Sequence, residues 1–321
     1  MSVERLLKIL SDGKFHSGDK LGSDLGVSRA AIWKQLKKVK ELNLPLTSIK
    51  GKGYQIEGGL DLLSGTEISS NLSVDAQYLL SSIDVEQVVD STNNLAMTQA
   101  LARQKGYVCT AEQQTTGRGR HGRGWVSPYG SNLYFSIVWE FQEGVSALDG
   151  LSLATGVAIA EALSELGVED VNLKWPNDVQ HAGKKLAGIL IEITGDAAGP
   201  CQVVLGVGLN VNMPKSASGT IDQPWIDIGS ILPAHPTRSH LLAALLNQIL
   251  PMLQTFEQEG FSAFHKRWDA RDALSGRQVS LNLGNEVVTG RVEGVDKSGA
   301  IVLRNQEGKL AFRGGEASLH R

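Results

Sequence analysis

Residues Gly117-Arg118-Gly119-Arg120-His121-Gly122-Arg123-Gly124-Trp125 form the most distinctive stretch of this 321-residue chain. Four glycines and three arginines without a carboxylate predict a loop, because glycine loses more backbone entropy on ordering than any other residue. Glycine also lets the backbone approach a ligand, and guanidinium presents a fixed fork of donors to carboxylate or phosphate. The stretch is typical of a loop that orders over a bound acid, with Trp125 as an apolar wall. Taken alone, it fits a flexible basic loop that touches nucleic acid equally well.

The length and composition indicate a folded protein of two or three domains. Hydrophobic residues make up 41% of the chain and charged residues 20%. No apolar run approaches the ~18 residues that a membrane helix needs, and residues 1–5 do not resemble a signal peptide. We therefore expect a cytoplasmic protein that has no membrane partner. Cys109 and Cys201 lie far apart in sequence, which predicts two reduced thiols that are poor nucleophile candidates.

Positive charge is concentrated near the N-terminus. Residues 1–57 contain 11 Lys and Arg against 6 Asp and Glu, a net charge of +5. The rest of the chain has 31−11=20 basic and 34−6=28 acidic residues, a net charge of −8. This division is expected when a small part of a protein meets a polyanion and the larger part has another task.

The basic segment has the spacing of a winged helix-turn-helix. Apolar residues predict a first helix from Val3 to Leu10, Ser17 and Ser28 can cap two more helices, and Gly26 begins the turn between them. A hairpin around residues 50–53 would be the basic wing. A helical bundle with a solvated basic face is the alternative. The residues that we expect to contact DNA are Ser28, Arg29, Lys34, Gln35, Lys37, Lys38, Lys50 and Lys52.

Beyond Gly58-Gly59, strand-like and helix-like segments alternate as far as residue 270, which is typical of an α/β domain. One strand ends at Asp90, and the polar run Ser91-Thr92-Asn93 then begins a helix. Such side chains usually cap the helix, but they can also hydrogen-bond the neutral polar head of a ligand.

Three later segments combine strand-forming residues with polar or small ones. Asn177-Asp178 is typical of a turn, although its carboxylate could also accept a hydrogen bond from ribose or bind a cation. Lys184-Lys185 precedes an apolar strand, so these lysines either lie in water at a hairpin tip or direct one ammonium group into a pocket. Gly206 and Gly208 interrupt another strand, where glycine often marks close approach of a ligand or a second backbone. Residues 213–230 are long enough to form a lid.

From residue 278 onward, short β-rich pieces separated by glycines predict a small SH3-like barrel. The expected domains are therefore residues 1–60, 61–272 and 273–321. The chain contains no P-loop, no complete dinucleotide-binding fingerprint, no Gly-x-Ser-x-Gly sequence and no metal-ligand spacing of His and Cys. The sequence therefore predicts no dedicated metal site.

The remaining pieces suit the attack of a carboxylate on the α-phosphate of ATP. Both reactants are anions that repel each other, so the site needs fixed positive groups. Arg118, Arg120 and Lys185 could supply them. An acyl-adenylate reacts readily with water, which is a physical reason for loops such as 117–124 and 213–230 to order over it.

Four motifs, in order, resemble those of the biotin-protein ligases. They are Gly-Arg-Gly-Arg-x-Gly-Arg-x-Trp at 117–125, Lys-Trp-Pro-Asn-Asp at 174–178, Lys-Leu-Ala-Gly-Ile-Leu-Ile-Glu at 185–192 and Gly-x-Gly-Leu-Asn at 206–210. With the N-terminal module, the whole chain resembles the bifunctional form that also represses the biotin operon. The resemblance implies a winged helix-turn-helix, a central α+β biotin/lipoate ligase-like catalytic domain and an SH3-like C-terminal barrel.

The resemblance also implies an activity and partners. The family uses ATP with Mg²⁺ to convert biotin to biotinyl-5′-AMP, and transfers the biotin to a lysine of the biotin carboxyl carrier protein of acetyl-CoA carboxylase. Biotinyl-5′-AMP is also the corepressor, which favours the homodimer that binds operator DNA.

Site residues are implied position by position. Lys185 matches the catalytic lysine, which contacts the acid and the phosphate, and Arg120 matches the arginine that helps to retain the adenylate. The residues matching biotin- or adenylate-binding positions are Ser91, Thr92, Asn93, Gln114, Gly117, Arg118, Gly119, Arg120, Trp125, Lys185, Gly188, Gly206 and Asn210. Asn177 and Asp178 match positions near the nucleotide and its metal.

Two departures from the family pattern concern nucleotide affinity. His121 stands where a third arginine is frequent, which lowers the local charge at neutral pH. The sequence stops at His320-Arg321, where known bifunctional proteins often continue with a basic residue near the nucleotide.

Two other functions fit part of the sequence. A transcription factor could sense a metabolite in its α/β domain without turnover, although the Arg and Lys set argues against it. A ligase for lipoate or octanoate would have a similar catalytic fold, although the N-terminal module and the Gly-Arg-Gly-Arg loop favour biotin.

Overall fold

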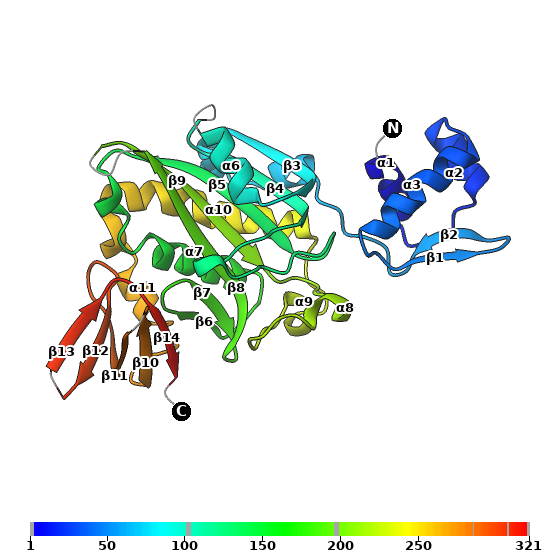
Figure 1. Ribbon diagram of the computed structural model, residues 1–321. Helices are drawn as coiled ribbons and strands as arrows, with labels where there is room; N and C mark the ends of the chain where they lie inside the picture. The colour runs from blue at the N-terminus through cyan, green and yellow to red at the C-terminus, as the bar shows by residue number, and fades with distance from the viewer. Residues whose placement is uncertain (1–2, 101–103, 196–198, 285, 307, 320–321) are drawn as a thin grey trace.

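The computed structural model describes residues 3–100, 104–195, 199–284, 286–306 and 308–319, and shows three parts arranged in a row (Figure 1). The N-terminal module lies at one end, the central domain carries a large sheet, and a small β domain lies at the other end. The chain ends considered above, residues 1–2 and 320–321, lie outside these ranges. No helix within the described ranges has both the length and the apolar character needed to cross a membrane.

The N-terminal module is a winged helix-turn-helix, as predicted. The Oγ atoms of Ser17 and Ser28 accept hydrogen bonds from Lys20 N and Ala31 N, which caps the second and third helices. Gly26 ends the second helix with φ 68°, a left-handed conformation that glycine adopts without strain. The elements are α1 (Val3–Leu10), α2 (Gly18–Leu25), α3 (Arg29–Glu41), β1 (Leu46–Ile49) and β2 (Gly53–Ile56).

This module packs on the central domain through Tyr129. The phenol ring is buried in the same apolar cluster as Leu6, Leu36 and Ile56 of the module. Its hydroxyl donates a hydrogen bond to Gln87 Oε1 at 2.5 Å, and burial raises the Tyr129 pKa above its usual range. Tyr129 therefore belongs to the core of a domain other than the one that carries it in sequence.

The segment that joins the two domains is held by a buried ion pair. Arg238 and Glu112 lie within salt-bridge distance and are almost completely buried. Arg238 Nε donates to Asp61 O at 2.8 Å, and Leu63 N donates to Glu112 Oε1 at 2.6 Å. These bonds satisfy charges that would be costly to bury alone, and they fix the start of the central domain.

The central domain is built on a seven-stranded sheet in the order β3-β4-β5-β9-β8-β7-β6. Only β3 and β4 run parallel, and the other neighbours are antiparallel, so the domain is α+β rather than a regular α/β alternation. The strands are β3 (Ser82–Val89), β4 (Tyr107–Gln114), β5 (Leu133–Phe141), β6 (Val171–Lys174), β7 (Asp178–His181), β8 (Lys184–Gly195) and β9 (Cys201–Leu209).

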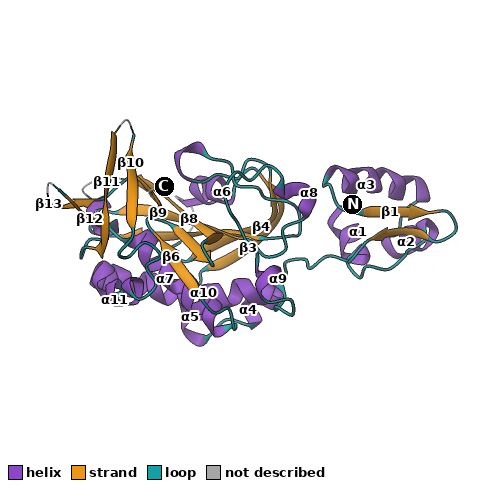
Figure 2. Ribbon diagram, turned by 90° about the horizontal axis from the view of Figure 1, so that it is seen from below, coloured by secondary structure: helices purple, strands orange, loops and turns teal. Residues whose placement is uncertain are grey.

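Helices cover both faces of this sheet (Figure 2). One face carries most of them, because α10 and α7 bury a single large core that includes Phe135, Ile137 and Trp139 of β5. On the opposite face, α6 packs on β4, β5 and β9 through Ala96 and Ala100. The helices are α4 (Gly65–Ser70), α5 (Val74–Leu79), α6 (Thr92–Ala100), α7 (Leu151–Glu165), α8 (Lys215–Ser218), α9 (Ile228–Ile231), α10 (Arg238–Glu259) and α11 (His265–Asp269), with 3-10 turns at Arg120–Gly122, Val145–Leu148 and Gly260–Ala263.

The C-terminal domain is a five-stranded antiparallel sheet in the order β13-β12-β11-β10-β14. It is joined to the central domain by contacts that include Trp175 Nε1, which donates to Gly299 O at 3.0 Å. The strands are β10 (Gln278–Leu283), β11 (Glu286–Val295), β12 (Ile301–Asn305), β13 (Gly308–Phe312) and β14 (Glu316–Leu319).

Candidate functional site

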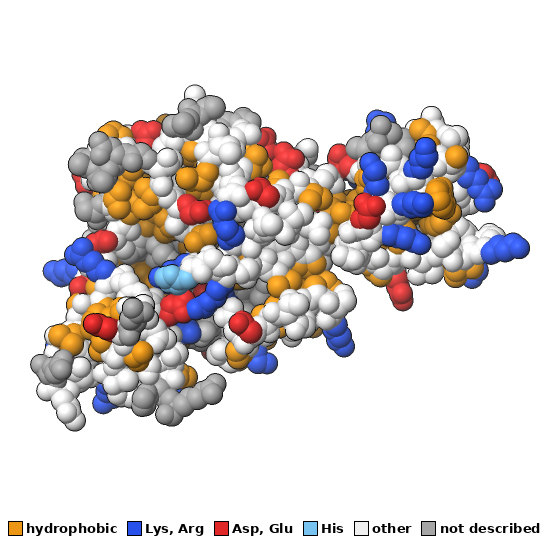
Figure 3. Space-filling model, viewed as in Figure 1, with side chains coloured by type: hydrophobic (Ala, Val, Ile, Leu, Met, Phe, Trp, Pro, Cys, Tyr) orange, Lys and Arg blue, Asp and Glu red, His pale blue; other side chains and the backbone are white. Residues whose placement is uncertain are grey.

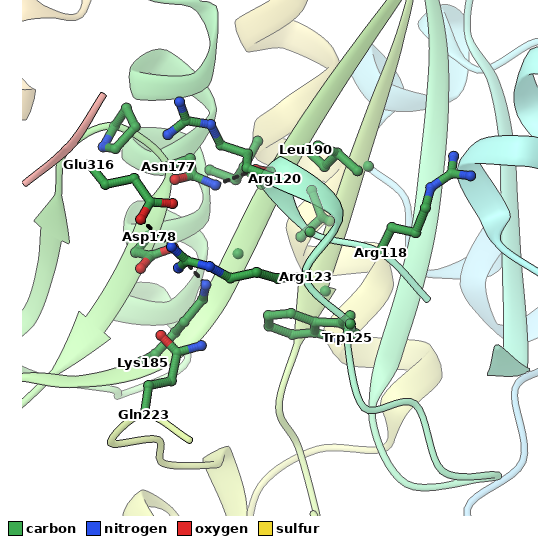
Figure 4. A pocket seen from close by; sticks show the side chains of 18 of the residues that line it. Arg118, Arg120, Arg123, Trp125, Asn177, Asp178, Lys185, Leu190, Gln223 and Glu316 are labelled. Atoms are coloured by element: carbon green, nitrogen blue, oxygen red, sulfur yellow. Dashed lines mark hydrogen bonds and ion pairs between the residues drawn. The ribbon is translucent and has the colours of Figure 1, made fainter. Parts of the chain in front are cut away.

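A cavity of about 250 Å³ opens between the Gly/Arg loop, the central sheet and β14 of the C-terminal domain (Figure 4). A second cavity of about 550 Å³ adjoins it, and Trp125 and Lys185 line both. The predicted site residues in the first cavity are Ser91, Thr92, Asn93, Gln114, Arg118, Gly119, Arg120, Trp125, Asn177, Asp178, Lys185, Gly188 and Gly206. Gly117 and Asn210 line the second cavity instead.

The polar run at the start of α6 is tied into the sheet. Gln114 Oε1 accepts hydrogen bonds from Thr92 N at 2.9 Å and Thr92 Oγ1 at 3.2 Å. The Ser136 hydroxyl lies 2.8 Å from Thr92 Oγ1 and 2.6 Å from Asn93 Oδ1. The side chains of Thr92 and Asn93 therefore do more than cap α6, because they hydrogen-bond to Gln114 of β4 and Ser136 of β5. Together these groups form a fixed polar end of the cavity.

Glu192 connects two of the predicted residues and was missed by the sequence analysis. Asn93 Nδ2 donates to Glu192 Oε2 at 2.7 Å, and Arg118 Nη2 donates to Glu192 Oε1 at 3.1 Å. Arg118 consequently points away from Lys185 and Asp178 in this structure (Figure 4). The sequence does contain a signal for Glu192 as a site residue: it is a carboxylate within the apolar strand β8, where an unpaired charge is costly.

The two adjacent lysines at the start of β8 have different environments. Lys184 is exposed. Lys185 Nζ lies 2.8 Å from Asp178 Oδ1, and the side chains of Lys185 and Asp178 are each 16% exposed. Successive strand residues point to opposite faces, so one lysine of such a pair must turn inward when the other meets water. Lys185 is held in register because its backbone pairs with residues 224–226. Its ammonium also lies 5.3 Å from the centre of the Trp125 ring.

The C-terminal domain closes one side of the Gly/Arg loop. Glu316 forms an ion pair with Arg123, and His121 Nε2 lies 3.9 Å from the other carboxylate oxygen. Arg120 Nη1 donates to Gly315 O at 3.4 Å. Burial lowers the pKa of the Arg120 guanidinium, partly opposed by the Glu316 charge, and the group stays a cation at any ordinary pH. Arg123 and Glu316 also line the cavity and were not among the predicted site residues.

Glycines in β8 and β9 make room for protein side chains. A Cβ atom added to Gly206 would lie 2.1 Å from Asn93 Oδ1, and one added to Gly208 would lie 2.4 Å from the Trp125 ring. Gly188 pairs with Gly208 across the two strands and lies under the same indole. The glycine pattern therefore serves close approach of Asn93 and Trp125, which themselves line the cavity.

The Trp125 indole N–H is buried and has no hydrogen-bond acceptor among the described residues. An unpaired buried donor costs about 1–3 kcal/mol, and a ligand that lies against the ring can offer an acceptor. This donor and the cations Lys185, Arg120 and Arg123 suit an anionic ligand with further polar groups.

The asparagines of two motifs brace the backbone around Lys185. Asn177 Nδ2 donates to Ile189 O at 2.8 Å. Asn210 Nδ2 donates to Ile226 O at 3.1 Å, which ties the 213–230 segment to the end of β9. These contacts give both amides a structural role around Lys185 that does not involve a ligand.

Other chemistries have little support in this region. Burial raises the pKa of the Cys109 thiol to about 12, so it is a poor nucleophile at neutral pH. In the ranges that the structure describes, no three His, Cys, Asp or Glu side chains gather as a metal site.

The predicted DNA-binding residues lie on one module. Ser28 caps α3, and Gln35 is half-buried. Figure 3 shows Lys and Arg side chains spread over the visible face of this module, with apolar side chains between them. Among the predicted residues, the exposed cations are Arg29, Lys34, Lys37 and Lys38 of α3, and Lys50 and Lys52 of the wing.

Each part of the chain matches a known protein family. Residues 3–55 match an HTH domain, residues 85–210 match the Biotin/lipoate A/B protein ligase family, and residues 274–320 match the Biotin protein ligase C terminal domain.

Individual relatives match over most of their length. The Bifunctional ligase/repressor BirA of Escherichia coli (strain K12) is 37% identical over 315 residues, which covers 98% of this chain and 96% of that protein. The Biotin--[acetyl-CoA-carboxylase] ligase of Paracoccus denitrificans is 31% identical over 237 residues, or 71% of this chain and 96% of the relative. A solved Biotin protein ligase from Aquifex aeolicus, in complex with biotin and ATP, superposes with a TM-score of 0.64 at 29% identity, covering 75% of this chain and 100% of that one. The chain therefore belongs to the family of bifunctional biotin ligase/repressors.

Proposed function

We propose that this protein joins biotin to ATP to form biotinyl-5′-AMP, and then transfers the biotin to a lysine of a biotin carboxyl carrier protein. The observation that supports this reaction best is the position of Lys185, which lines both adjoining cavities and pairs with Asp178 at 2.8 Å. A carboxylate held in one cavity and a phosphate held in the other would meet at this ammonium group.

The charges around Lys185 suit the first step. When the biotin carboxylate attacks the α-phosphate, a bond forms between a carboxylate oxygen and phosphorus, and pyrophosphate leaves. Lys185, Arg120 and Arg123 are positive groups already held near this point, so they stabilise the charge that builds up there. Asp178 holds the ammonium group in position through their ion pair while substrates are absent. Mg²⁺ would accompany ATP, and Asp178 and Asn177 supply the hard oxygen atoms that this cation prefers.

The polar end of the cavity favours biotin over lipoate. Thr92, Asn93 and Gln114 present hydroxyl and amide groups of the kind that hydrogen-bond the ureido ring of biotin. A dithiolane ring offers neither strong donors nor strong acceptors, so binding it would desolvate these groups without compensation. Ser91, Gly119 and Gly206 also line this cavity.

The N-terminal module, residues 1–60, binds operator DNA with biotinyl-5′-AMP as corepressor. The catalytic domain spans residues 61–272 and the C-terminal domain residues 273–321. The outer edge of β8 offers a surface for a homodimer: β7 pairs with it only from Lys184 to Gly188, and no other described strand covers the rest. Ile193 on this edge is 40% exposed. An exposed strand edge is a ready template for pairing with a second copy. A cytoplasmic location stays a prediction.

Exchange of labelled pyrophosphate into ATP, measured with the purified protein and either biotin, lipoate or octanoate, tests the enzyme. We expect exchange with biotin alone. Exchange with lipoate in place of biotin would reassign the acid, and no exchange with any acid would favour a ligand sensor without turnover. Sedimentation with and without biotin and ATP tests the dimer, which should appear only with both.

A further inference from the structure

An exposed tryptophan stands on the helix that carries most of the predicted DNA contacts. The buried face of α3 consists of Ile32, Leu36 and Val39, which are at most 3% exposed. Trp33 lies outside this face and is 54% exposed, and it is the one tryptophan among the exposed large apolar side chains of the described residues. A single exposed apolar residue is ordinary on a protein surface, so its neighbours decide whether it has a role.

Those neighbours are cations. Arg29 and Lys37 lie one helical turn before and after Trp33 on the same side of α3. Lys37 Nζ lies 3.9 Å from the centre of the Trp33 ring, a cation–π contact that restrains both side chains. Lys34 and Lys38 are exposed on the same helix. Two acidic groups lie near this surface: Asp19 of α2, which lies 3.8 Å from Arg29 and is 78% exposed, and the exposed Glu41, one helical turn after Lys37.

A large apolar ring surrounded by cations matches a particular kind of partner. The partner must carry dense negative charge and also present an apolar group a few ångströms below that charge. The major groove of B-DNA does this, because phosphates line its rims and the C5-methyl group of thymine lies on its floor. An acidic protein surface would satisfy the lysines and offer no regular counterpart for the ring.

We infer that Trp33 is a base-reading residue that packs on thymine methyl groups in the major groove and so contributes sequence specificity. This inference rests on the proposed DNA binding of the N-terminal module. Lys37 holds the ring in place, and the surrounding cations bind phosphates and set the register of α3 without reading sequence. The indole N–H adds a donor for a thymine O4 or a purine N7 at the same base step.

The test uses the full-length protein with biotin and ATP. Two duplexes serve as probes. The first is the duplex that the wild-type protein selects from a random-sequence pool, and the second has the same sequence with deoxyuridine in place of every thymidine. Deoxyuridine lacks the methyl group and keeps the same hydrogen-bonding pattern. We expect this replacement to weaken wild-type binding by about three- to tenfold. Trp33→Ala should bind the thymidine duplex roughly tenfold more weakly, and the replacement should then have no further effect.

Two variants separate base reading from other effects. Trp33→Phe keeps a flat apolar ring and should retain part of the sensitivity to deoxyuridine. Lys38→Ala should weaken binding to both duplexes equally and reduce the salt dependence, because a phosphate contact is insensitive to the base. Circular dichroism and the melting temperature of each variant verify the fold.

The outcomes are distinct. If Trp33→Ala binds as tightly as wild type, or still responds to deoxyuridine, Trp33 does not read thymine and the inference is overturned. If the wild-type protein selects no duplex at all, the proposed DNA binding fails and takes this inference with it.

Discussion

The ammonium nitrogen of Lys185 lies 2.8 Å from a carboxylate oxygen of Asp178, and each side chain is 16% exposed. Lys185 lies at the junction of two adjoining cavities, and Asp178 lines the first of them. Because the two side chains are mostly buried and paired, each holds the other in place, and an arriving anion finds a cation that is already oriented.

Lys185→Ala should lower the rate of adenylate formation by roughly 100-fold or more, because it removes the cation at this junction. The adjacent Lys184 is exposed and provides a matched control, since Lys184→Ala removes the same charge from solvent. Biotin-dependent pyrophosphate exchange measures both variants. An equal loss in the two would show that net charge matters and the position of Lys185 does not.

Arg120→Gly should let biotinyl-5′-AMP escape before transfer, because this variant removes a half-buried cation that the C-terminal domain holds over the cavity. The release rate of labelled adenylate should rise by roughly tenfold or more, while its formation changes less. Arg313→Gly, which removes an exposed arginine paired with Asp149, serves as the control. Retention equal to wild type would contradict a role for Arg120 in holding the intermediate.

Gly206→Ala should weaken biotin binding, because the new methyl group would lie 2.1 Å from Asn93 Oδ1 and must displace that amide. Overpacking of this kind costs about 1–3 kcal/mol, which corresponds to roughly 5- to 150-fold in affinity if the strain falls on the bound state. Calorimetric titration with biotin measures the change. In Gly219→Ala the methyl group meets no atom within 4 Å, so its affinity should equal that of wild type.

Asp272→Asn should stabilise the protein more at pH 7.5 than at pH 4. Burial raises the pKa of Asp272 to about 6, and its Oδ2 atom has no partner among the described residues. The folded state therefore holds a proton between pH 4 and pH 6 that the unfolded state has lost, so this group's contribution to stability falls across that window as the pH rises. Asparagine does not titrate, so the variant avoids this loss of unfolding free energy, which is on the order of 2 kcal/mol.

Thermal melting of wild type and Asp272→Asn at pH 4, 5, 6 and 7.5 provides the comparison. The difference in melting temperature should grow up to about pH 6 and stay constant above it. A difference that does not depend on pH would mean that the carboxyl group titrates at its ordinary pKa.

Tyr129→Ala should loosen the N-terminal module without unfolding it, because Tyr129 fills the module's core from the central domain. Proteolysis within residues 57–62 should accelerate by roughly tenfold, since the linker is then released more often. Tyr78→Ala is the matched control, because Tyr78 is 86% exposed. Unchanged cleavage in Tyr129→Ala would show that the Glu112–Arg238 pair alone holds the linker.

Much of the fold follows from local sequence. Ser17, Gly26 and Ser28 determine where the first helices start and stop, because helix caps depend on the hydrogen bonds of a few neighbouring residues. Apolar runs likewise locate β3, β4, β5 and β9 within a few residues. The Gly/Arg loop and the Lys185 strand are recognisable as a site because their residue types are unusual for a loop and for a buried strand.

The tertiary structure decided which of these residues meet. The sequence left open whether Lys185 lies in water or in a pocket, and whether the polar side chains after Asp90 only cap a helix. It gave no indication that Arg118 pairs with Glu192, 74 positions away, or that Arg123 pairs with Glu316, 193 positions away. Such contacts depend on strand order and register, which are set by the packing of the whole sheet rather than by neighbouring residues. The sequence by itself determined the local elements and the chemical groups available, and only the folded chain determined which groups share a cavity.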